Sequence, residues 1–244
     1  MEIKQLALIT GVGKETGIGY EVARQLSALN YKVIVTARKL ETSAQLAAAL
    51  QKEGVDAVPL ELDISLEESV KEAARQIDAQ YGKLDVLINN ATLFPDRFDT
   101  LTVDLEDVKK VFDNNFIGYW RCIKYFTPVL RKSTNPRIVN MSSATGSYGD
   151  PAYGLHHPPS GVISAYGLSK LATNGLTLKA AIDLKPDHIL VNSVDPGLTA
   201  SYEAFAAYGA RPVNISAQSV VFAATLPKDG PTGKFFQDGV EVPW

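Results

Sequence analysis

The chain has 244 residues, 45% of them hydrophobic, and a formal net charge of −3. This length and apolar content suffice for one large core, so we expect a single domain over residues 1–244. No apolar run approaches the roughly 20 residues of a membrane span, and the first residues lack the features of a signal peptide. The mildly acidic balance argues against a nucleic-acid binder. The only cysteine, Cys122, excludes internal disulfides, and we expect a cytoplasmic protein.

Short apolar runs alternate with longer segments of helical periodicity along the chain. The runs predict buried strands at residues 6–9, 33–35, 58–62, 86–88, 138–141 and 189–194. A first helix is expected to bury Ile18, Val22, Leu26 and Leu29, and further helices are expected at 43–53, 66–81, 104–130 and 163–184. This alternation predicts a three-layer α/β/α, Rossmann-type fold with a doubly wound parallel sheet.

Several shorter signals complete this outline. Ser65 and Glu68 have the spacing of a capping box that would open the third helix. Glycines and prolines predict a loop over residues 146–161. A last strand is expected at 234–237, followed by a turn at Asp238 and Gly239 and by an apolar ending, 240–244, that packs back on the fold.

The stretch TGVGKETGIG, residues 10–19, lies between the first predicted strand and the first predicted helix. In a doubly wound sheet, ligands bind at the carboxyl ends of the strands, where a helix N-terminus offers N–H groups to a pyrophosphate. Glycine lets the backbone turn tightly and lets a ligand approach closely. The stretch predicts a dinucleotide phosphate site, with a glycine-rich turn that binds nothing as the alternative.

The end of the second predicted strand indicates which dinucleotide would bind. A fold that prefers NAD places an acidic residue about 20 residues beyond the glycine loop, where it holds the ribose 2′-OH. Here the chain has Arg38 and Lys39, and the first carboxylate is Glu41. A guanidinium suits a 2′-phosphate in charge and in donor geometry. We therefore expect NADP(H), held by Arg38, unless the two cations are an ordinary solvated pair.

Tyr166 and Lys170 lie four residues apart in a predicted helix, so they share one face. An ammonium beside a phenol favours the phenolate, so we expect Lys170 to lower the pKa of Tyr166 from its usual value of about 10. Such a tyrosine can donate a proton to a carbonyl that receives a hydride, or take one from an alcohol. Alone, the pair could also be an accidental surface pair.

The combined motifs resemble the classical short-chain dehydrogenases/reductases, especially the carbonyl-reductase-like members. The landmarks follow in order over essentially the whole chain: the glycine loop, Asp63, Asn89-Asn90-Ala91, Asn115-Phe116-Ile117-Gly118, Ser142-Ser143, Tyr166 with Lys170, and Asp195-Pro196-Gly197. Each landmark is common by itself, but the ordered set is specific. Three histidines and one cysteine do not suggest a metal site.

The resemblance implies a role for each matching residue. Tyr166 would be the general acid for reduction, Lys170 would hold the nicotinamide ribose, and Ser143 would hydrogen-bond the substrate oxygen. Asn115 would hold a water that connects Lys170 to solvent. Residues implied to contact the cofactor are Gly11, Gly17, Ile18, Gly19, Arg38, Asp63, Ile64, Asn90, Ala91, Tyr166, Lys170, Pro196, Gly197 and Thr199. Asn114 and Ser142 are the neighbouring alternatives to Asn115 and Ser143, and Asp195 is expected to be structural.

The glycine loop departs from the family pattern because it holds two more residues within positions 12–16. We expect Lys14 to reach the 2′-phosphate beside Arg38, Thr16 to bond a phosphate oxygen, and Glu15 to face solvent. Thr92 also stands where the family often has glycine. The interval between Ser143 and Tyr166 is longer than usual, and the extra segment is expected over the mouth of the active site.

The stretch SYEAFAAYGARPVN, residues 201–214, follows the Pro-Gly pair and is rich in alanine and aromatic residues. It predicts a mobile lid that excludes water during hydride transfer. Tyr202, Phe205 and Tyr208 are candidates to line an apolar pocket, with ordinary packing as an equal alternative.

The sequence thus predicts an NADPH-dependent oxidoreductase that transfers a hydride between NADP(H) and a carbonyl or secondary alcohol, most readily reducing aldehydes or ketones. Two alternatives are a dehydrogenase that oxidises a sugar or steroid-like alcohol and a non-catalytic protein that senses NADP(H). The expected partner is a small carbonyl or alcohol substrate, without nucleic acid or membrane. A homodimer, a homotetramer and a monomer all stay open.

Overall fold

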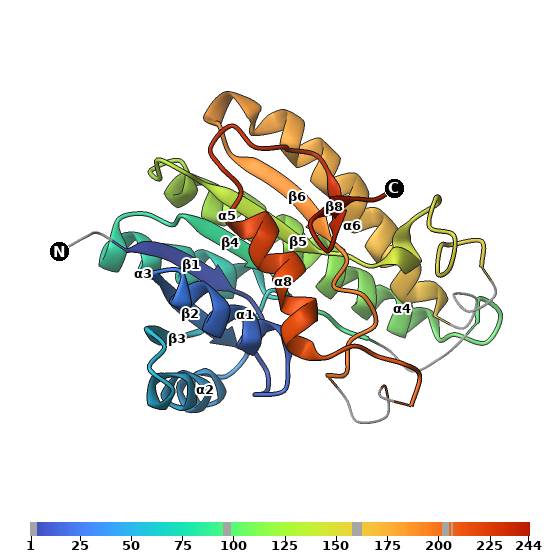
Figure 1. The fold of residues 1–244 in the computed structure, drawn as a ribbon, viewed down its shortest axis with the longest axis horizontal. Helices are drawn as coiled ribbons and strands as arrows, with labels where there is room; N and C mark the ends of the chain where they lie inside the picture. Colours follow the sequence, from blue (N-terminus) through green and yellow to red (C-terminus); the bar gives the residue numbers. More distant parts are fainter. Residues whose placement is uncertain (1–3, 95–98, 158–162, 202–204, 206) are drawn as a thin grey trace.

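The computed structural model describes residues 4–94, 99–157, 163–201, 205 and 207–244. Within them, an eight-stranded sheet has the order β3-β2-β1-β4-β5-β6-β7-β8 (Figure 1). The strands are β1 Gln5–Ile9, β2 Tyr31–Ala37, β3 Ala57–Glu61, β4 Val86–Asn89, β5 Arg137–Met141, β6 Leu190–Val194, β7 Phe235–Gln237 and β8 Val240–Glu241. β1 to β7 pair in parallel, and β8 pairs with β7 antiparallel.

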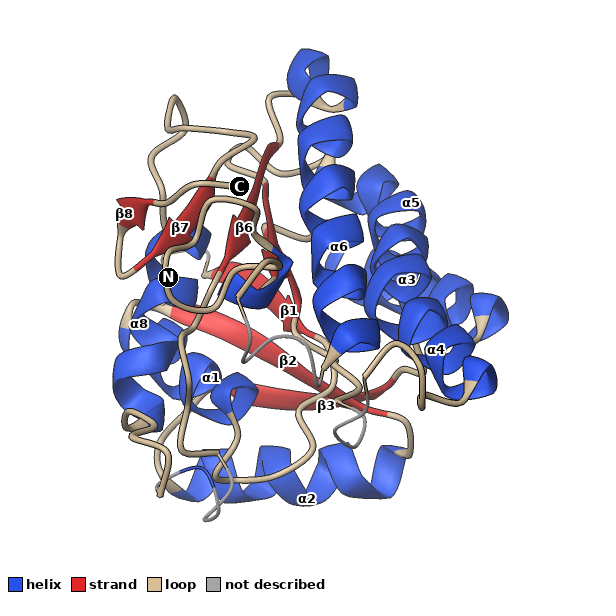
Figure 2. Ribbon diagram, turned by 90° about the vertical axis from the view of Figure 1, so that its right-hand side faces the viewer, coloured by secondary structure: helices blue, strands red, loops and turns tan. Residues whose placement is uncertain are grey.

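Helices cover both faces of the sheet. They are α1 Ile18–Ala28, α2 Leu40–Lys52, α3 Glu67–Tyr81, α4 Leu105–Phe112, α5 Gly118–Leu130, α6 Ser164–Asp183 and α8 Val213–Ala224, with short 3₁₀ turns at Ala144–Gly146 and Lys185–Asp187. Figure 2 shows α1, α2 and α8 on one side of the sheet and α3, α4, α5 and α6 on the other. The predicted three-layer fold is confirmed.

The apolar strands follow from burial on both faces, because helices cover each side of a parallel sheet. Leu8 in β1 and Leu87 in β4 are fully buried. In α1, Val22 and Leu26 face the core as predicted, but Leu29 does not. Leu29 is the C-cap of α1 and lies after the last residue of the helix. It is therefore no longer on the helix face that packs against the sheet, and 53% of it is exposed.

The segment predicted as one helix, 104–130, contains a π-helical turn at Asp113–Ile117 between α4 and α5. Asp104 caps α4 by accepting a hydrogen bond from the Glu106 amide at 2.8 Å. A π turn inserts an extra residue, and such turns are frequent at functional sites. Here the turn directs Asn115 into the interior, where it is fully buried.

The predicted capping box at Ser65 and Glu68 is wrong. Leu66 is the N-cap of α3 and no side chain bonds that end of the helix. The Ser65 hydroxyl instead donates to the Asp63 carboxylate at 2.7 Å, and Glu68 pairs with Lys71. The nearby carboxylate therefore takes the hydroxyl that would have capped the helix.

The last residues of the chain pack back on the fold, as predicted. The Trp244 carbonyl accepts hydrogen bonds from the Tyr148 and Gly149 amides, each at 2.9 Å. The Trp244 ring stacks on Phe235 with centroids 5.5 Å apart. The turn between β7 and β8 falls at Asp238 and Gly239, both with positive φ. Among the described helices, none combines the length and the apolar character needed to cross a membrane.

Candidate active site

The strand order reverses between β1 and β4, which is where a doubly wound sheet binds its ligands. The loops that follow these two strands are joined through one buried side chain. The Thr10 hydroxyl oxygen accepts hydrogen bonds from the Asn90 amide at 2.9 Å and from the Ala91 amide at 3.0 Å. The Asn90 side chain donates to the Thr10 carbonyl at 2.7 Å. The glycine loop and the Asn90-Ala91 pair therefore form one rigid wall of the site.

Two glycines of this loop have no room for a side chain. Gly11 has φ +65°, and a Cβ there would lie 2.5 Å from the Ala91 Cα. A Cβ on Gly19 would lie 2.8 Å from the side-chain nitrogen of Asn90. By contrast, a Cβ on Gly13 would meet no atom within 4 Å. Gly11 and Gly19 are thus required by close packing, and Gly13 belongs to the extended rim.

The N-terminus of α1 opens directly from this loop. Gly17 is its N-cap, and no side chain bonds that end of the helix. The first N–H groups of a helix have no intrahelical partner and carry a partial positive charge. The glycine cradle and the uncapped helix end together fit a pyrophosphate, which such ends bind without further side chains.

The extra residues of the glycine loop contact the start of the expected lid. The Lys14 ammonium donates to the Ser201 carbonyl at 2.6 Å, and the Thr16 hydroxyl lies 3.5 Å from the same oxygen. Glu15 is exposed. The expected phosphate contacts of Lys14 and Thr16 stay predictions, since in this structure both side chains point to Ser201.

Two further cofactor candidates flank the loop. Arg38 follows β2 and is exposed, and it forms no ion pair with the residues that the structure describes. Asp63 follows β3, and its carboxylate holds Ser65. Ile64 is buried beneath α5, and its carbonyl accepts a hydrogen bond from Arg121 at 3.2 Å. Arg38 is thus a free cation at the rim, whereas Asp63 and Ile64 already have local partners.

Asn115 clamps the loop that follows β4. Its side-chain amide donates to the Leu93 carbonyl at 2.9 Å, and its side-chain oxygen accepts from the Leu93 amide at 2.8 Å. It also donates to the Ser169 hydroxyl at 3.1 Å, and its backbone carbonyl accepts from Thr173 at 3.0 Å. Asn114 bonds Ala91 and the Asn115 side chain. The described contacts therefore give Asn115 a role in positioning, and the water that it is expected to hold stays a prediction.

Lys170 projects from α6 into the interior, where only 1% of it is exposed. Its ammonium donates to the Met141 carbonyl at 2.7 Å and to the Thr92 hydroxyl at 3.2 Å. It lies 5.5 Å from the centre of the Tyr166 ring and 5.2 Å from that of Tyr119. Burial lowers the pKa of Lys170 to about 7, and the Asp195 charge opposes this shift.

The expected lowering of the Tyr166 pKa is wrong for this structure. Burial raises the pKa of Tyr166, the Asp195 charge raises it further, and a hydrogen bond with Ser143 partly offsets both. The reason is that burial disfavours the charged phenolate and that the Asp195 carboxylate repels it. Ser143 also binds Thr145, whose amide and hydroxyl lie 3.3 Å and 3.0 Å from the Ser143 hydroxyl. Tyr166, Ser143 and Lys170 are brought together as predicted.

An aromatic wall stands beside Tyr166. The Phe94 ring meets the Tyr166 ring edge to face with centroids 4.8 Å apart, although Phe94 is 45% exposed. Phe205, from the expected lid, lies 6.3 Å from Phe94 on its other side. Tyr208 is 62% exposed, and Tyr202 lies outside the described residues. Of the lid aromatics, Phe205 is therefore the one that the structure brings to the site.

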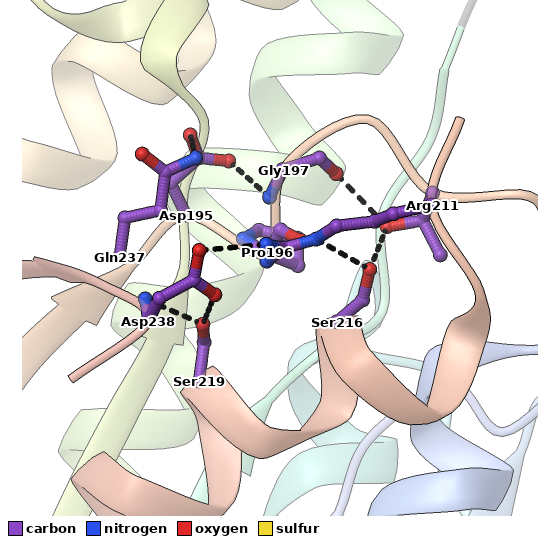
Figure 3. Close-up of polar contacts among 9 residues, drawn as sticks. Asp195, Pro196, Gly197, Arg211, Ser216, Ser219, Gln237 and Asp238 are labelled. Carbon is purple, nitrogen blue, oxygen red and sulfur yellow. Dashed lines mark hydrogen bonds and ion pairs between the residues drawn. The ribbon is translucent and has the colours of Figure 1, made fainter. Parts of the chain in front are cut away.

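The loop after β6 is fastened by Arg211 (Figure 3). The Arg211 guanidinium donates to the Pro196 carbonyl at 2.8 Å and to the Asp238 carboxylate at 2.7 Å. A Cβ on Gly197 would lie 2.9 Å from that guanidinium. The Thr199 hydroxyl donates to the Gly197 carbonyl at 2.8 Å. Pro196, Gly197 and Thr199, the residues expected near the nicotinamide, thus form one braced unit.

Asp195 joins this loop to the Ser143 turn. Its carboxylate accepts hydrogen bonds from the Gly197 amide at 2.8 Å and from the Ala144 amide, and burial raises its pKa to about 6. Gln237 donates to its other oxygen at 3.2 Å. These contacts agree with the structural role expected for Asp195.

The sequence matches the family model described as short chain dehydrogenase over residues 5–207. The chain belongs to the short-chain dehydrogenase family. Curated relatives agree with this assignment. The chain is 30% identical to 3-oxoacyl-[acyl-carrier-protein] reductase FabG of Staphylococcus aureus over 202 residues, covering 82% of this chain and 77% of that protein. It is 32% identical to the uncharacterized oxidoreductase YxjF of Bacillus subtilis, covering 80% of this chain and 70% of that protein.

Two solved structures have the same fold. ElxO with NADP bound superposes with a TM-score of 0.82 at 27% identity, covering 97% of this chain and 98% of ElxO. An NADPH-bound carbonyl reductase from chicken fatty liver superposes with a TM-score of 0.84 at 23% identity, covering 99% of each chain, and shows the fold alone. ElxO was solved with NADP, the cofactor that the sequence predicts for this chain.

Sequence reasoning missed several residues of this short-chain dehydrogenase site. Thr92, Phe94 and Arg211 each contact a predicted site residue. Because Thr92 stands where the family often has glycine, this departure from the pattern could have marked Thr92 as a site residue. Phe94 and Arg211 carry no pattern of their own, since their partners are distant in sequence. In the part of the chain that the structure describes, no group of three or more His, Cys, Asp or Glu side chains could hold a metal ion.

Proposed function

We propose that this short-chain dehydrogenase reduces a ketone or aldehyde with NADPH as the hydride donor. The observation that carries the proposal is the meeting of Tyr166, Ser143 and Lys170 at the carboxyl edge of the sheet, next to the glycine cradle. The FabG relatives are named as reductases of 3-oxoacyl groups, and ElxO was solved with NADP. The FabG name favours a carbonyl substrate, and the ElxO structure favours the phosphorylated cofactor.

The cofactor fits the cradle by its shape and its charge. The glycine loop and the α1 N-terminus would hold the pyrophosphate, and Arg38 would hold the 2′-phosphate. Lys170 would bind the nicotinamide ribose, beside the braced Pro196-Gly197 loop. When bound, the nicotinamide supplies the hydride to the carbonyl carbon.

The protein residues supply the proton and stabilise the developing charge. Ser143 would donate a hydrogen bond to the carbonyl oxygen, where negative charge develops as the hydride arrives. Tyr166 would give its hydroxyl proton to the same oxygen, which completes the alcohol and leaves a phenolate. Burial raises the pKa of Tyr166, so the phenol keeps its proton at neutral pH until the carbonyl oxygen becomes basic as the hydride arrives.

The walls of the site favour a substrate with an apolar part. Phe94 presents aromatic surface next to Tyr166, and Phe205 lies next to Phe94. Oxidation of an alcohol by the same residues is the reverse reaction and stays the alternative. A non-catalytic sensor is disfavoured because Asn115, Ser143, Tyr166 and Lys170 are all present.

The first test compares the wild-type protein with Tyr166→Phe while NADPH oxidation is followed against ketones, aldehydes, quinones and diketones. We expect turnover by the wild type and a loss of at least a hundredfold in kcat in the variant, because the general acid is removed. NADPH affinity, measured by fluorescence, should change little. Equal turnover by the two proteins would contradict the assignment of Tyr166.

A further inference from the structure

Lys170 has two acceptors among the described residues for its three N–H groups. One is the Met141 carbonyl, a backbone group at the end of β5. The other is the Thr92 hydroxyl, which belongs to the loop after β4. One N–H then remains for a ribose hydroxyl of the cofactor. The direction of that third N–H is fixed only if both acceptors stay in place.

The Thr92 hydroxyl has two further hydrogen-bond partners besides Lys170, although Thr92 itself is exposed. It donates to the Asn90 carbonyl at 3.1 Å and lies 3.1 Å from the Tyr119 hydroxyl, which is fully buried. If Tyr119 donates, the Thr92 oxygen uses its two lone pairs for Tyr119 and Lys170 and its proton for Asn90. This arrangement makes the hydroxyl a fixed acceptor for the ammonium.

The loop that carries Thr92 is fixed by Asn115. The Asn115 side chain bonds both the amide and the carbonyl of Leu93, the next residue in the chain. Asn115 can do so because the π turn directs it inward. A continuous path of contacts therefore runs from Asn115 through Leu93 and Thr92 to Lys170.

We infer that Thr92 is a positioning residue that holds the Lys170 ammonium in its charged form and aims its remaining N–H at the cofactor ribose. This inference rests on the proposed function, in which Lys170 binds that ribose. A hydrogen bond to the charged form of a group favours that form. Thr92 thus opposes the effect of burial, which lowers the pKa of Lys170.

In the described part of the chain, the other titratable groups near Lys170 are three neutral side chains and one carboxylate. Tyr166 on its own helix and Tyr119 and Cys122 on α5 are neutral, because burial raises the pKa of each. The Asp195 carboxylate, after β6, raises the pKa of Lys170 by its charge. Thr92 and Asp195 therefore favour the charged lysine from two separate loops.

The test replaces Thr92 by valine, which keeps the shape and removes the hydroxyl, and by serine, which keeps the hydroxyl. We expect Thr92→Val to lower the pKa of Lys170 by about one unit, the size of one hydrogen bond to a charged group. The high-pH limb of kcat/KM for reduction should move down by the same amount. Thr92→Ser should restore both, and Thr225→Val, an exposed threonine on the far end of α8, should change neither.

The pKa is read directly by carbon NMR of the lysine ε-methylene groups, with Lys170 assigned by its absence in Lys170→Met. This readout needs no turnover, so it tests the role of Thr92 separately from the proposed function. A lower Lys170 pKa in Thr92→Val, in a protein that reduces none of the substrates, would support the inference and contradict the proposed function. An unchanged Lys170 titration in Thr92→Val would overturn the inference. The same pH profile of turnover in the wild type, Thr92→Val and Thr92→Ser would also overturn the inference.

Discussion

At the scale of single residues, we propose that Arg38 sets the choice between the two nicotinamide cofactors. It is exposed at the end of β2 and has no carboxylate partner in the described chain. We expect Arg38→Gln to raise the KM for NADPH by about tenfold to a hundredfold, the value of one charge-assisted hydrogen bond, while the KM for NADH stays the same. Steady-state kinetics with both cofactors measure this, with the exposed Lys52→Gln on α2 as the matched control.

An unchanged KM for NADPH in Arg38→Gln would show that this guanidinium does not bind the 2′-phosphate. Lys14 would then be the next cation to replace. In this structure Lys14 reaches Ser201, 187 positions away, so it would have to exchange that carbonyl for the phosphate.

Residue types that carry their own chemistry could be predicted from the sequence. The spacing of Tyr166 and Lys170 places them on one face of α6 whatever surrounds them. The pKa of Tyr166 could not be predicted, because it depends on burial that no local pattern records. The role of Thr92 could not be predicted either, because its contact with Lys170 spans 78 positions of the chain.

At the scale of elements, the glycine loop makes a sharp stability prediction. Gly11→Ala should lower the free energy of unfolding by about 2–4 kcal/mol, because a left-handed alanine costs about 1–2 kcal/mol and its Cβ would collide with the Ala91 backbone. Gly13→Ala, with open space around it and no positive φ, should stay within about 0.5 kcal/mol of the wild type. Urea unfolding measures both.

Equal stabilities of Gly11→Ala and Gly13→Ala would mean that the loop can move away from Ala91. The joint wall of glycine loop and Asn90-Ala91 would then not be rigid. The NADPH affinity of the same variants shows whether the pyrophosphate site is lost together with the stability.

Helices and strands could be predicted wherever the spacing of apolar residues kept one period along the segment. The buried strands and α6 were predicted within a few residues for this reason. The π turn at Asp113–Ile117 was not, because the apolar pattern continues through it and the turn is fixed by what Asn115 bonds. Helix α8 was missed because small residues such as Ala217 and Ser219 form its buried face and leave a weak pattern.

At the scale of the whole molecule, the order of the sheet gathers residues from the entire chain at one edge. Thr10 follows β1, Asn90 follows β4, Ser143 follows β5 and Pro196 follows β6. Most of the family landmarks were recognisable in the sequence because they stand at such strand ends, whereas Asn115 and the Tyr166–Lys170 pair lie in helical segments. The braces between them, such as Arg211 with Pro196 and Asp238, appear only in the folded chain.

We propose that the residues at this edge of the sheet direct a hydride from NADPH to a carbonyl carbon. The most direct measurement uses NADPH deuterated at both C4 positions and mass spectrometry of the alcohol formed from the best carbonyl substrate. We expect one deuterium on the carbinol carbon of each product molecule with the wild type, and almost no product with Tyr166→Phe. Tight NADPH binding without deuterium transfer to any carbonyl tested would contradict it and would favour a protein that senses the cofactor.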